Sequence, residues 1–373
     1  MPDGSFLTRS SNFPPVALDD AVRDLLSRDC VVAVGVSGGK DSVACALAVN
    51  DHLDAIGHTG PRVLVHADLG KVEWKDSLPT CQRLAARIGW ELIVVSRKAG
   101  GMMERWESRW AANLARYQDL SCVKIILPWS TPSMRFCTSE LKVDVITREL
   151  KKLFPGQDIL NVAGIRRQES AARKQKPISS PEGKLKRGGN FGLNWNAIIE
   201  WNVDEVFARI AAAGLEPHEA YKLGSSRVSC AFCIMGSLPD LTVSANCADN
   251  QEVYLRMVEL EAASTFAFQG SRWLADVAPW LLPPSLKSNV ALAKEKALKR
   301  HELEAMIPDH LLYTKGWPTV LPTDQEAAHL ADIRNHVAAL FGVENQHRTA
   351  KAILARYTDL MATLSKGQLE LAF

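Results

Sequence analysis

The sequence predicts an α/β protein with a doubly wound, mainly parallel sheet, followed by an all-helical C-terminal region. Two observations predict the sheet: short, purely apolar runs recur along the first part of the chain, and stretches with helical periodicity separate them. A third observation predicts the helical region, because after Leu238 the apolar residues keep a helical spacing. The chain has 373 residues, 47% of them hydrophobic, which is enough to bury a full core in more than one structural unit.

Each element can be placed along the chain. The predicted strands are 31–36, 62–67, 91–96, 124–127 and 158–163, and helices are predicted between them at 41–56, 75–88, 139–153 and, later, 203–213. The C-terminal helices are predicted at 250–263, 285–301, 324–341 and 346–364. We expect an N-terminal extension over 1–25, a sheet domain over 26–240 and a helical region over 241–373. Within the sheet domain, the turn-rich basic stretch 173–192 is expected to be a mobile surface loop.

Composition limits the class of protein. The net charge is only +2, so no overall field draws the chain to nucleic acid or to a membrane. The sequence has no apolar run of about 18 residues and no signal-type N-terminus, so we expect a cytoplasmic protein with no membrane contact. Eight cysteines in such a chain indicate metal-binding, catalytic or buried thiols rather than a disulfide framework.

The most informative motif follows the first predicted strand. A glycine-rich turn leads into the predicted helix 41–56, and its residues are Ser37, Gly38, Gly39, Lys40, Asp41 and Ser42. Such a turn aims backbone N–H groups at an anion, while the glycines allow close approach and the lysine adds a point charge. The Walker A pattern is absent. We therefore predict a phosphate-binding loop for a nucleotide.

Two further strand ends carry polar residues that suit such a site. His66 and Asp68 lie at the end of the second predicted strand, where a carboxylate can hold Mg²⁺, bond adenosine or simply form an Asx turn. Gly164 and Arg166 follow the fifth predicted strand. Because the carboxyl ends of parallel strands share one edge of a sheet, we expect these residues to lie beside the loop.

Cysteines form a second group of candidates. Cys137 is preceded by Arg135 and followed by a predicted helix N-terminus, a positive environment that favours thiolate. Cys230 and Cys233 form a C-x-x-C pair. With Cys247 they offer enough thiols for a [4Fe–4S] cluster or a zinc ion. The remaining four lie in apolar segments and are predicted to be core residues: Cys30, Cys45, Cys81 and Cys122.

Together these motifs resemble the PP-loop ATP pyrophosphatase superfamily, and within it the phosphoadenosine phosphosulfate (PAPS) reductase-like family, near the DNA phosphorothioation sulfurtransferases. The likeness covers about residues 25–240. Besides the loop, it is carried by R-F-C-T-S-E-L-K at 135–142, G-I-R-R-Q-E-S at 164–170, and H-E-A-Y at 218–221 followed by R-V-S-C-A-F-C at 227–233. It implies an adenine nucleotide α-hydrolase-like fold and cleavage of ATP between the α and β phosphates.

The resemblance also implies the roles of individual residues. Catalytic roles are expected for Lys40, Asp41, Cys137 and Arg166. Nucleotide binding is expected of Ser37, Gly38, Gly39, Lys40, Asp41, Ser42, His66, Asp68, Gly164 and Arg166. The expected metal ligands are Cys137, Cys230, Cys233 and Cys247. The implied cofactors are ATP with Mg²⁺ and a [4Fe–4S] cluster, with Zn²⁺ as the alternative.

The sequence departs from that family in two places. Assimilatory APS reductases have a second cysteine where this chain has Thr138, which leaves Cys247 as the replacement ligand. If Cys247 binds, the site is closed and structural; if not, one iron is open, and a third reading makes Cys137 a persulfide carrier. PAPS and APS reductases also have a degraded glycine loop, whereas here it is intact, which favours ATP itself.

We therefore expect an ATP-dependent adenylating enzyme that delivers sulfur through an Fe–S cluster or a cysteine carrier. The alternatives are a PAPS or APS reductase that releases sulfite, a sulfate-adenylylating subunit, and a nucleotide- and cluster-binding regulatory subunit of a DNA-modification or defence system. A sulfur donor such as a cysteine desulfurase is the implied partner, and nucleic acid is one candidate acceptor for the basic stretch 166–187. The helical region is compatible with homo-oligomerisation.

Overall fold

The computed structural model describes residues 13–370 and divides them into two compact units. The first, here called the sheet unit, contains the chain up to Met102 and Ser133–Asn250. The second, the helical unit, contains Met103–Pro132 and the chain from Gln251 onward. The sequence prediction had placed 103–132 in the sheet domain, but its apolar side chains pack with those of the C-terminal helices.

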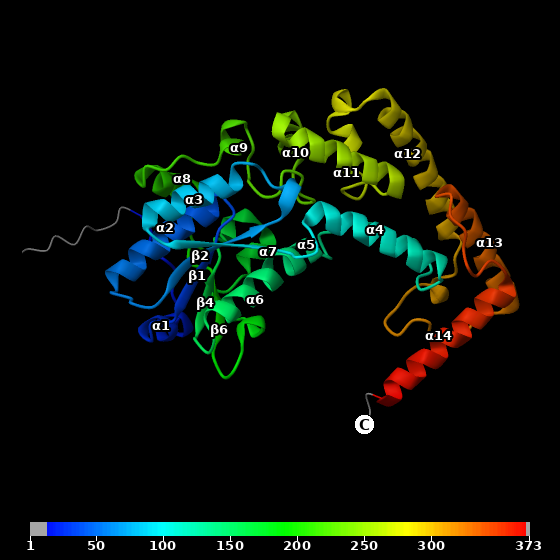
Figure 1. The fold of residues 1–373 in the computed structure, drawn as a ribbon, viewed down its shortest axis with the longest axis horizontal. Coiled ribbons are helices and arrows are strands. Elements are labelled where there is room, and N and C mark those ends of the chain that lie inside the picture. Colours follow the sequence, from blue (N-terminus) through cyan, green and yellow to red (C-terminus); the bar gives the residue numbers. More distant parts are fainter. Residues whose placement is uncertain (1–12, 371–373) are drawn as a thin grey trace, which may run out of the picture. The chain divides into compact units, whose positions relative to one another are not determined.

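The sheet unit contains a six-stranded sheet with the order β3-β2-β1-β4-β6-β5 (Figure 1). Its strands are β1 (Val31–Gly35), β2 (Arg62–Asp68), β3 (Glu91–Ser96), β4 (Ile159–Val162), β5 (Ser179–Pro181) and β6 (Gly192–Trp195). All neighbours are parallel except β5, which runs antiparallel to β6. The chain runs outward from β1 to β3 on one side and from β4 to β5 on the other. This is the doubly wound, mainly parallel sheet that the sequence predicts.

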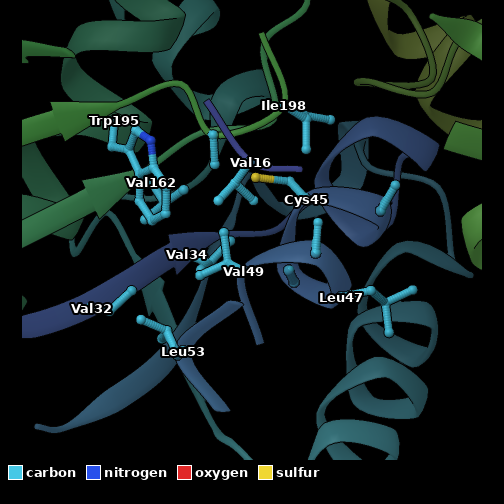
Figure 2. Close-up of a cluster of buried hydrophobic side chains, with 14 of the residues drawn as sticks. Val16, Val32, Val34, Cys45, Leu47, Val49, Leu53, Val162, Trp195 and Ile198 are labelled. Atoms are coloured by element: carbon cyan, nitrogen blue, oxygen red, sulfur yellow. The ribbon is translucent and has the colours of Figure 1, made fainter. Parts of the chain in front are cut away.

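Side chains of β1 alternate between two apolar layers. Val32 and Val34 lie in one core with α2 and with Trp195 of β6 (Figure 2). Val31 and Ala33 face the other layer, which is formed with α6. Since each fully buried aliphatic side chain contributes about 1.5–3 kcal/mol, burial on both faces explains why the strand is apolar throughout.

Helices flank the sheet on both sides. Those of the sheet unit are α1 (Asp20–Ser27), α2 (Lys40–Ala55), α3 (Ser77–Ile88), α5 (Phe136–Thr138), α6 (Asp144–Leu153), α7 (Ala171–Lys174), α8 (Val203–Ala212), α9 (Glu219–Lys222) and α10 (Leu238–Asn246). A π-helical turn, η2 (Ser139–Val143), joins α5 to α6. Short 3₁₀ turns are η1 (Gly70–Val72), η3 (Arg167–Glu169), η4 (Gly183–Leu185) and η5 (Ala248–Asn250).

The expected N-terminal extension is only partly described, since residues 1–12 lie outside the described residues. From Phe13 on, the segment is part of the sheet unit's core rather than an extension. Val16 is buried, and the indole nitrogens of Trp195 and Trp201 donate hydrogen bonds to the carbonyl oxygens of Ala17 and Pro15, at 2.7 and 3.2 Å.

Two other expectations were wrong. Residues 124–127 form no strand but an irregular buried segment of the helical unit, where the Glu304 carboxylate accepts the Ile125 N–H at 2.8 Å. The basic stretch 173–192 is not one open loop: it contains β5, and its chain returns as β6. Ser180 pairs with Asn194 between these two strands, which orders the stretch.

The helical unit contains the five longer helices of the remaining chain. These are α4 (Met102–Gln118), α11 (Gln251–Ser264), α12 (Pro284–Ala305), α13 (Asp324–Leu340) and α14 (Ala350–Glu370), with 3₁₀ turns η6 (Leu274–Asp276), η7 (Pro279–Leu281) and η8 (Asp309–Leu311). In its core the Arg334 guanidinium covers the Tyr117 ring at 4.1 Å and donates to the Cys122 carbonyl at 2.8 Å. Among the described residues, no helix is long and apolar enough to span a bilayer.

Candidate functional site

The predicted phosphate loop joins β1 to α2 at the carboxyl edge of the sheet. Gly38 has φ +74°, and a Cβ there would lie 2.9 Å from the Ser77 carbonyl oxygen, so only glycine fits. The Ser42 hydroxyl accepts the Ser37 N–H at 3.2 Å and donates to the Gly39 carbonyl at 2.8 Å. Both serines therefore fix the shape of the loop.

Backbone N–H groups line this loop. Within the part of the chain that the structure describes, those of Gly38, Gly39 and Asp41 have no hydrogen-bond acceptor. The N–H of Lys40, in contrast, donates to the Tyr221 hydroxyl at 3.0 Å. Three open donors at the N-terminus of a 16-residue helix form a concave anion site.

A charged cluster lies beside these donors. The Arg166 Nε donates to the Asp41 carboxylate at 2.6 Å, and the Lys40 ammonium lies 3.4 Å from the other Asp41 oxygen. The side chains of Arg166 and Lys40 are only 4% and 8% exposed. Two cations and one carboxylate leave a net positive charge next to the anion site, in a setting of low dielectric constant.

Gly164 allows the loop after β4 to lie against the first turn of α2. A Cβ on this residue would lie 2.4 Å from the Asp41 carbonyl oxygen and 2.9 Å from the Ser42 nitrogen. The backbone of the β4 loop therefore lies directly on the first turn of α2. The structure thus brings together the loop 37–42, Gly164 and Arg166, as the sequence predicts, at the point between β1 and β4 where strand order reverses.

The end of β2 carries His66 and Asp68, both of which the sequence predicts to bind the nucleotide. His66 is buried, with Nδ1 3.0 Å from the Val36 carbonyl and Nε2 3.1 Å from the Glu73 carboxylate. Both ring nitrogens therefore contact protein atoms in this structure. Burial opposes a charged ring, but hydrogen bonding to Cys81 and Glu73 outweighs it and raises the His66 pKa to about 10. Asp68 forms an Asx turn through Oδ1, which accepts the Gly70 N–H at 2.7 Å, and its Oδ2 remains open.

Two residues next to the loop were not among the candidates. His218 packs against Gly38, and Tyr221 bonds Lys40. Burial lowers the His218 pKa to about 4, so the ring is neutral; Nδ1 accepts the Ala220 N–H at 3.0 Å, and Nε2 lies 3.3 Å from the Ser77 hydroxyl. The only sequence signal for them was the H-E-A-Y block, whose distance along the chain hides its contact with the loop.

The C-x-x-C segment contacts the chain that follows β2. Glu73 and Cys230 form an antiparallel bridge, and the Ala231 N–H donates to the Val72 carbonyl at 2.8 Å. The Cys233 sulfur accepts the Met235 N–H at 3.4 Å. Such N–H···S contacts stabilise negative charge on sulfur, which a metal-bound cysteine carries.

Electrostatics place a third thiol near this pair. The Cys230 thiol is enclosed by protein atoms although the residue is partly exposed, and this burial raises its pKa to about 12. The Lys142 ammonium acts against that rise, while the thiols of Cys233 and Cys137 add to it. The Cys137 and Cys233 thiols and the Lys142 ammonium therefore lie within electrostatic range of the Cys230 thiol.

Cys247, the fourth expected ligand, directly follows α10. Its thiol acts electrostatically on the Lys75 ammonium, which is paired with Asp249. Among the described residues, no three His, Cys, Asp or Glu side chains converge on a point where one ion could bind. The C-x-x-C pair offers two thiols, which suit both a [4Fe–4S] cluster and a zinc ion.

The remaining cysteines and four of the tryptophans are core residues. The buried thiols are Cys30, Cys45, Cys81 and Cys122, as expected, and the structure pairs none of the eight cysteines in a disulfide. Trp195 and Trp201 are buried in the sheet unit, and Trp106 and Trp129 in the helical unit. These indoles line no described cleft.

The basic stretch is divided between the two ends of the sheet. Ser179 of β5 lies opposite Trp195, at the carboxyl end of β6, so the chain before β5 lies at the end that carries the phosphate loop. Exposed Lys174 and Lys176 belong to that part. Lys186 and Arg187 follow β5 and lie at the opposite end. Only the first pair is placed to meet a substrate of the loop.

The fold and this edge define an α/β protein with a phosphate-binding loop at the strand-order reversal of a doubly wound sheet. The model of the phosphoadenosine phosphosulfate reductase domain matches residues 31–235, more than half of the chain, and the chain belongs to that family, within the PP-loop superfamily. The family comprises nucleotide-using enzymes that reduce or transfer sulfur.

Two curated relatives are similar over part of their length. An uncharacterised 37.8 kDa protein from the gpa 5′ region of Escherichia phage 186 is 28% identical over 231 residues, which is 54% of this chain and 66% of the relative. An uncharacterised protein of Methanocaldococcus jannaschii is 21% identical over 276 residues, 73% of this chain and 57% of the relative. The match thus spans less than two thirds of either relative.

Two solved structures resemble this chain only weakly. PAPS reductase from Candida auris, solved as a phosphate complex, has a TM-score of 0.35 and 14% identity, covering 58% of this chain and 98% of that one. The U34-tRNA thiolase NcsA from Methanococcus maripaludis, solved with its [4Fe–4S] cluster, has a TM-score of 0.37 and 15% identity, covering 77% and 76%. Likenesses of this degree say nothing about activity.

Proposed function

We propose that this protein cleaves ATP between the α and β phosphates, transfers AMP to an acceptor oxygen and delivers sulfur to the activated acceptor. The observation that carries the proposal is the intact loop 37–42 with three open N–H donors, set beside the cluster of Lys40, Asp41 and Arg166. A substrate that is already activated, such as PAPS, needs no site for a leaving pyrophosphate. An intact loop therefore favours ATP.

In this mechanism an acceptor oxygen attacks the α phosphorus, the bond from that phosphorus to the bridging oxygen breaks, and pyrophosphate leaves. The open N–H groups hold the phosphates, and Lys40 and Arg166 offset the charge that grows on the leaving group. Asp41 positions Arg166 through its 2.6 Å bond. The open Oδ2 of Asp68 is the candidate ligand for the magnesium ion that accompanies ATP. A sulfur nucleophile then displaces AMP from the acceptor.

Cys137, Cys230 and Cys233 are the residues that would hold a [4Fe–4S] cluster, which when bound supplies iron with high affinity for sulfur. The Lys142 ammonium acts against the rise that burial causes in the Cys230 pKa. The chain's own part is to hold the three thiols within reach of the nucleotide edge through the Glu73–Cys230 bridge. Exposed Lys174 and Lys176 favour a polyanionic acceptor, and we propose nucleic acid.

The test uses full-length protein purified without oxygen and ATP labelled at the α phosphate, with bulk tRNA or DNA as acceptor and a persulfide donor. We expect AMP and pyrophosphate in equal amounts, and a loss of about 100-fold or more in Lys40→Ala, since it removes charge stabilisation and a buried contact. Lys186→Ala, at the opposite end of the sheet, is the control and should keep its activity.

The family itself favours one second candidate, a thiol-dependent reductase that releases sulfite from PAPS or APS. The same preparation tests it by incubation with either nucleotide and a dithiol, followed by assay of sulfite. Sulfite release without AMP formation from ATP would replace the proposed function by that reductase. Tight ATP binding with neither product would instead indicate a sensing role.

A further inference from the structure

One side chain joins the phosphate loop to the segment that leads to the C-x-x-C pair. The Tyr221 hydroxyl accepts the Lys40 N–H at 3.0 Å, and the Lys40 ammonium lies 5.3 Å from the centre of the Tyr221 ring. Burial raises the pKa of this phenol, and the amide dipoles of Lys40 and Val228 both act against the rise. The phenol oxygen therefore fixes the backbone of the loop at Lys40, and the Lys40 side chain lies over the same ring.

The two segments also touch directly. A Cβ on Gly39 would lie 3.3 Å from the Val228 carbonyl oxygen, and the Lys40 ammonium donates to the Ser226 carbonyl at 3.4 Å. The tyrosine ring is fixed in turn by Phe207, whose ring meets it edge to face at a centroid distance of 5.6 Å. These contacts hold the Tyr221 side chain in one position beside the loop.

The contact continues to the far side of the cysteine pair. The Asp240 carboxylate accepts both the N–H and the hydroxyl of Ser226, at 2.7 and 3.0 Å, and also accepts the hydroxyl of Ser237 at 2.7 Å. Ser237 caps α10, directly after the turn that contains Cys233. An unbroken chain of contacts therefore runs from Lys40 through Ser226 and Asp240 to the residues on both sides of the C-x-x-C pair.

We propose that Tyr221 is a positioning residue that couples nucleotide binding at the loop to the order of the cysteine segment 226–233. This inference rests on the proposed function and extends it: Tyr221 holds the backbone of Lys40, and the Lys40 ammonium binds the cysteine segment at the Ser226 carbonyl. Phosphate bound at the open donors of Gly38, Gly39 and Asp41 fixes the loop. Tyr221 keeps Lys40 in the position from which it contacts Ser226, and so passes that order to the cysteine segment. Linkage makes the effect reciprocal, so the state of the cysteines changes nucleotide affinity by the same factor.

Amide hydrogen exchange measures this coupling without depending on turnover or on a loaded metal site. The ligand is α,β-methylene-ATP with Mg²⁺, because its methylene bridge replaces the bond that would break. In the wild type we expect slower exchange in peptides covering both 36–43 and 226–233. In Tyr221→Phe, which keeps the ring and removes the acceptor, we expect slower exchange at 36–43 only. Loss of one net hydrogen bond should also weaken binding of the analogue about three- to tenfold.

Tyr254→Phe is the matched control. Its hydroxyl is also buried and hydrogen-bonded, donating to the Leu274 carbonyl and accepting the Ala278 N–H, but it lies in the helical unit. This variant should behave as the wild type. Protection of 226–233 that persists in Tyr221→Phe, or is missing in a wild type protected at 36–43, overturns the coupling alone. A wild type in which the analogue protects neither segment contradicts nucleotide binding and so overturns the proposed function as well.

Discussion

The Arg166 guanidinium donates a 2.6 Å hydrogen bond to the Asp41 carboxylate, and this pair joins the loop after β4 to the first turn of α2. The two residues stand on opposite sides of the point where strand order reverses, and both are largely buried. Because the Arg166 side chain also donates to Gln168 at 2.7 Å, its fork is held in one orientation. The positive edge of the site is therefore fixed before any ligand arrives.

Arg166→Lys should lower turnover strongly, because an ammonium group keeps the charge but not the planar fork that meets Asp41 and Gln168. We expect the rate of AMP formation from ATP to fall about 10- to 100-fold. Arg209→Lys is the matched control, since Arg209 is also buried and paired with an aspartate, Asp51, but between α2 and α8. Equal rates for the two variants would contradict a role for Arg166 at the phosphates.

Gly164→Ala should damage the site through sterics alone. Its Cβ meets backbone atoms at 2.4 Å, so the first turn of α2 must move away from the β4 loop. We expect a loss of about 1–3 kcal/mol in stability and much weaker binding of a fluorescent ATP analogue. Gly183→Ala has open space around its Cβ and an ordinary φ, so calorimetry and binding should find it close to the wild type.

Serine substitutions test which cysteines act together. We expect Cys137→Ser, Cys230→Ser and Cys233→Ser to lose most of the iron and acid-labile sulfide of anaerobically purified protein, because each removes a proposed ligand. Cys247→Ser should retain both, since it is not one of the three proposed ligands. Equal losses in all four variants would make Cys247 a ligand. Zinc without sulfide in the wild type would exclude the cluster.

Glu261 should make the stability of the helical unit depend on pH. Burial raises its pKa to about 7, although its carboxylate accepts N–H groups of Phe268, Leu274 and Ala275 at 2.7–3.0 Å. A raised pKa means that the folded state binds this proton more tightly than the unfolded state, whose value is about 4.3. The stabilisation is therefore complete below about pH 4 and is lost as the pH rises through 7.

The measurement is the denaturation midpoint of wild type and Glu261→Gln between pH 5 and pH 8. The variant cannot ionise at this position, so the difference between the two proteins isolates Glu261 from other titrating groups. We expect the wild type to lose about 2–3 kcal/mol relative to the variant across this range. A difference that does not change with pH would show that Glu261 keeps the same charge throughout.

The divided basic stretch gives a test of the proposed acceptor. Lys174 and Lys176 lie at the end of the sheet that carries the loop, and Lys186 and Arg187 at the other. Replacing the first pair by glutamate should weaken binding of tRNA or DNA and reduce its salt dependence by about two phosphate contacts. The same change at the second pair should leave both unaffected. Equal effects would mean that the nucleic acid binds away from the loop.

Local patterns were enough to predict the central strands. β1 to β4 agree with the sequence prediction to within one residue at each end, because a short apolar run bounded by turn residues is a local signal for a strand. β5 and β6 gave no such pattern: the first contains a proline, and the second begins after two glycines with positive φ. They form because β6 pairs with β4 and β5 pairs with β6. A short stretch of sequence does not contain these pairings.

The error at 124–127 has a similar cause. The run packs into the core of the helical unit, but its Ile125 N–H is bonded by Glu304, which lies 179 residues further along the chain, and not by a neighbouring strand. The same limit applies to the site. The loop, Gly164 and Arg166 follow strands and were predictable from strand ends, whereas the Tyr221 hydroxyl reaches Lys40 from 181 residues away. Such a contact exists only in the folded chain and cannot be predicted from the local sequence around either residue.

The division of the chain has a consequence for its synthesis. Met103–Pro132 packs with helices that begin only at Gln251, so the ribosome makes the whole second part of the sheet unit in between. At about 5–20 residues per second, this leaves α4 for roughly 10 s without the side chains that cover Trp106 and Tyr117. During that interval the nascent chain leaves the apolar side of an amphipathic helix uncovered, which makes α4 a segment that chaperones would meet.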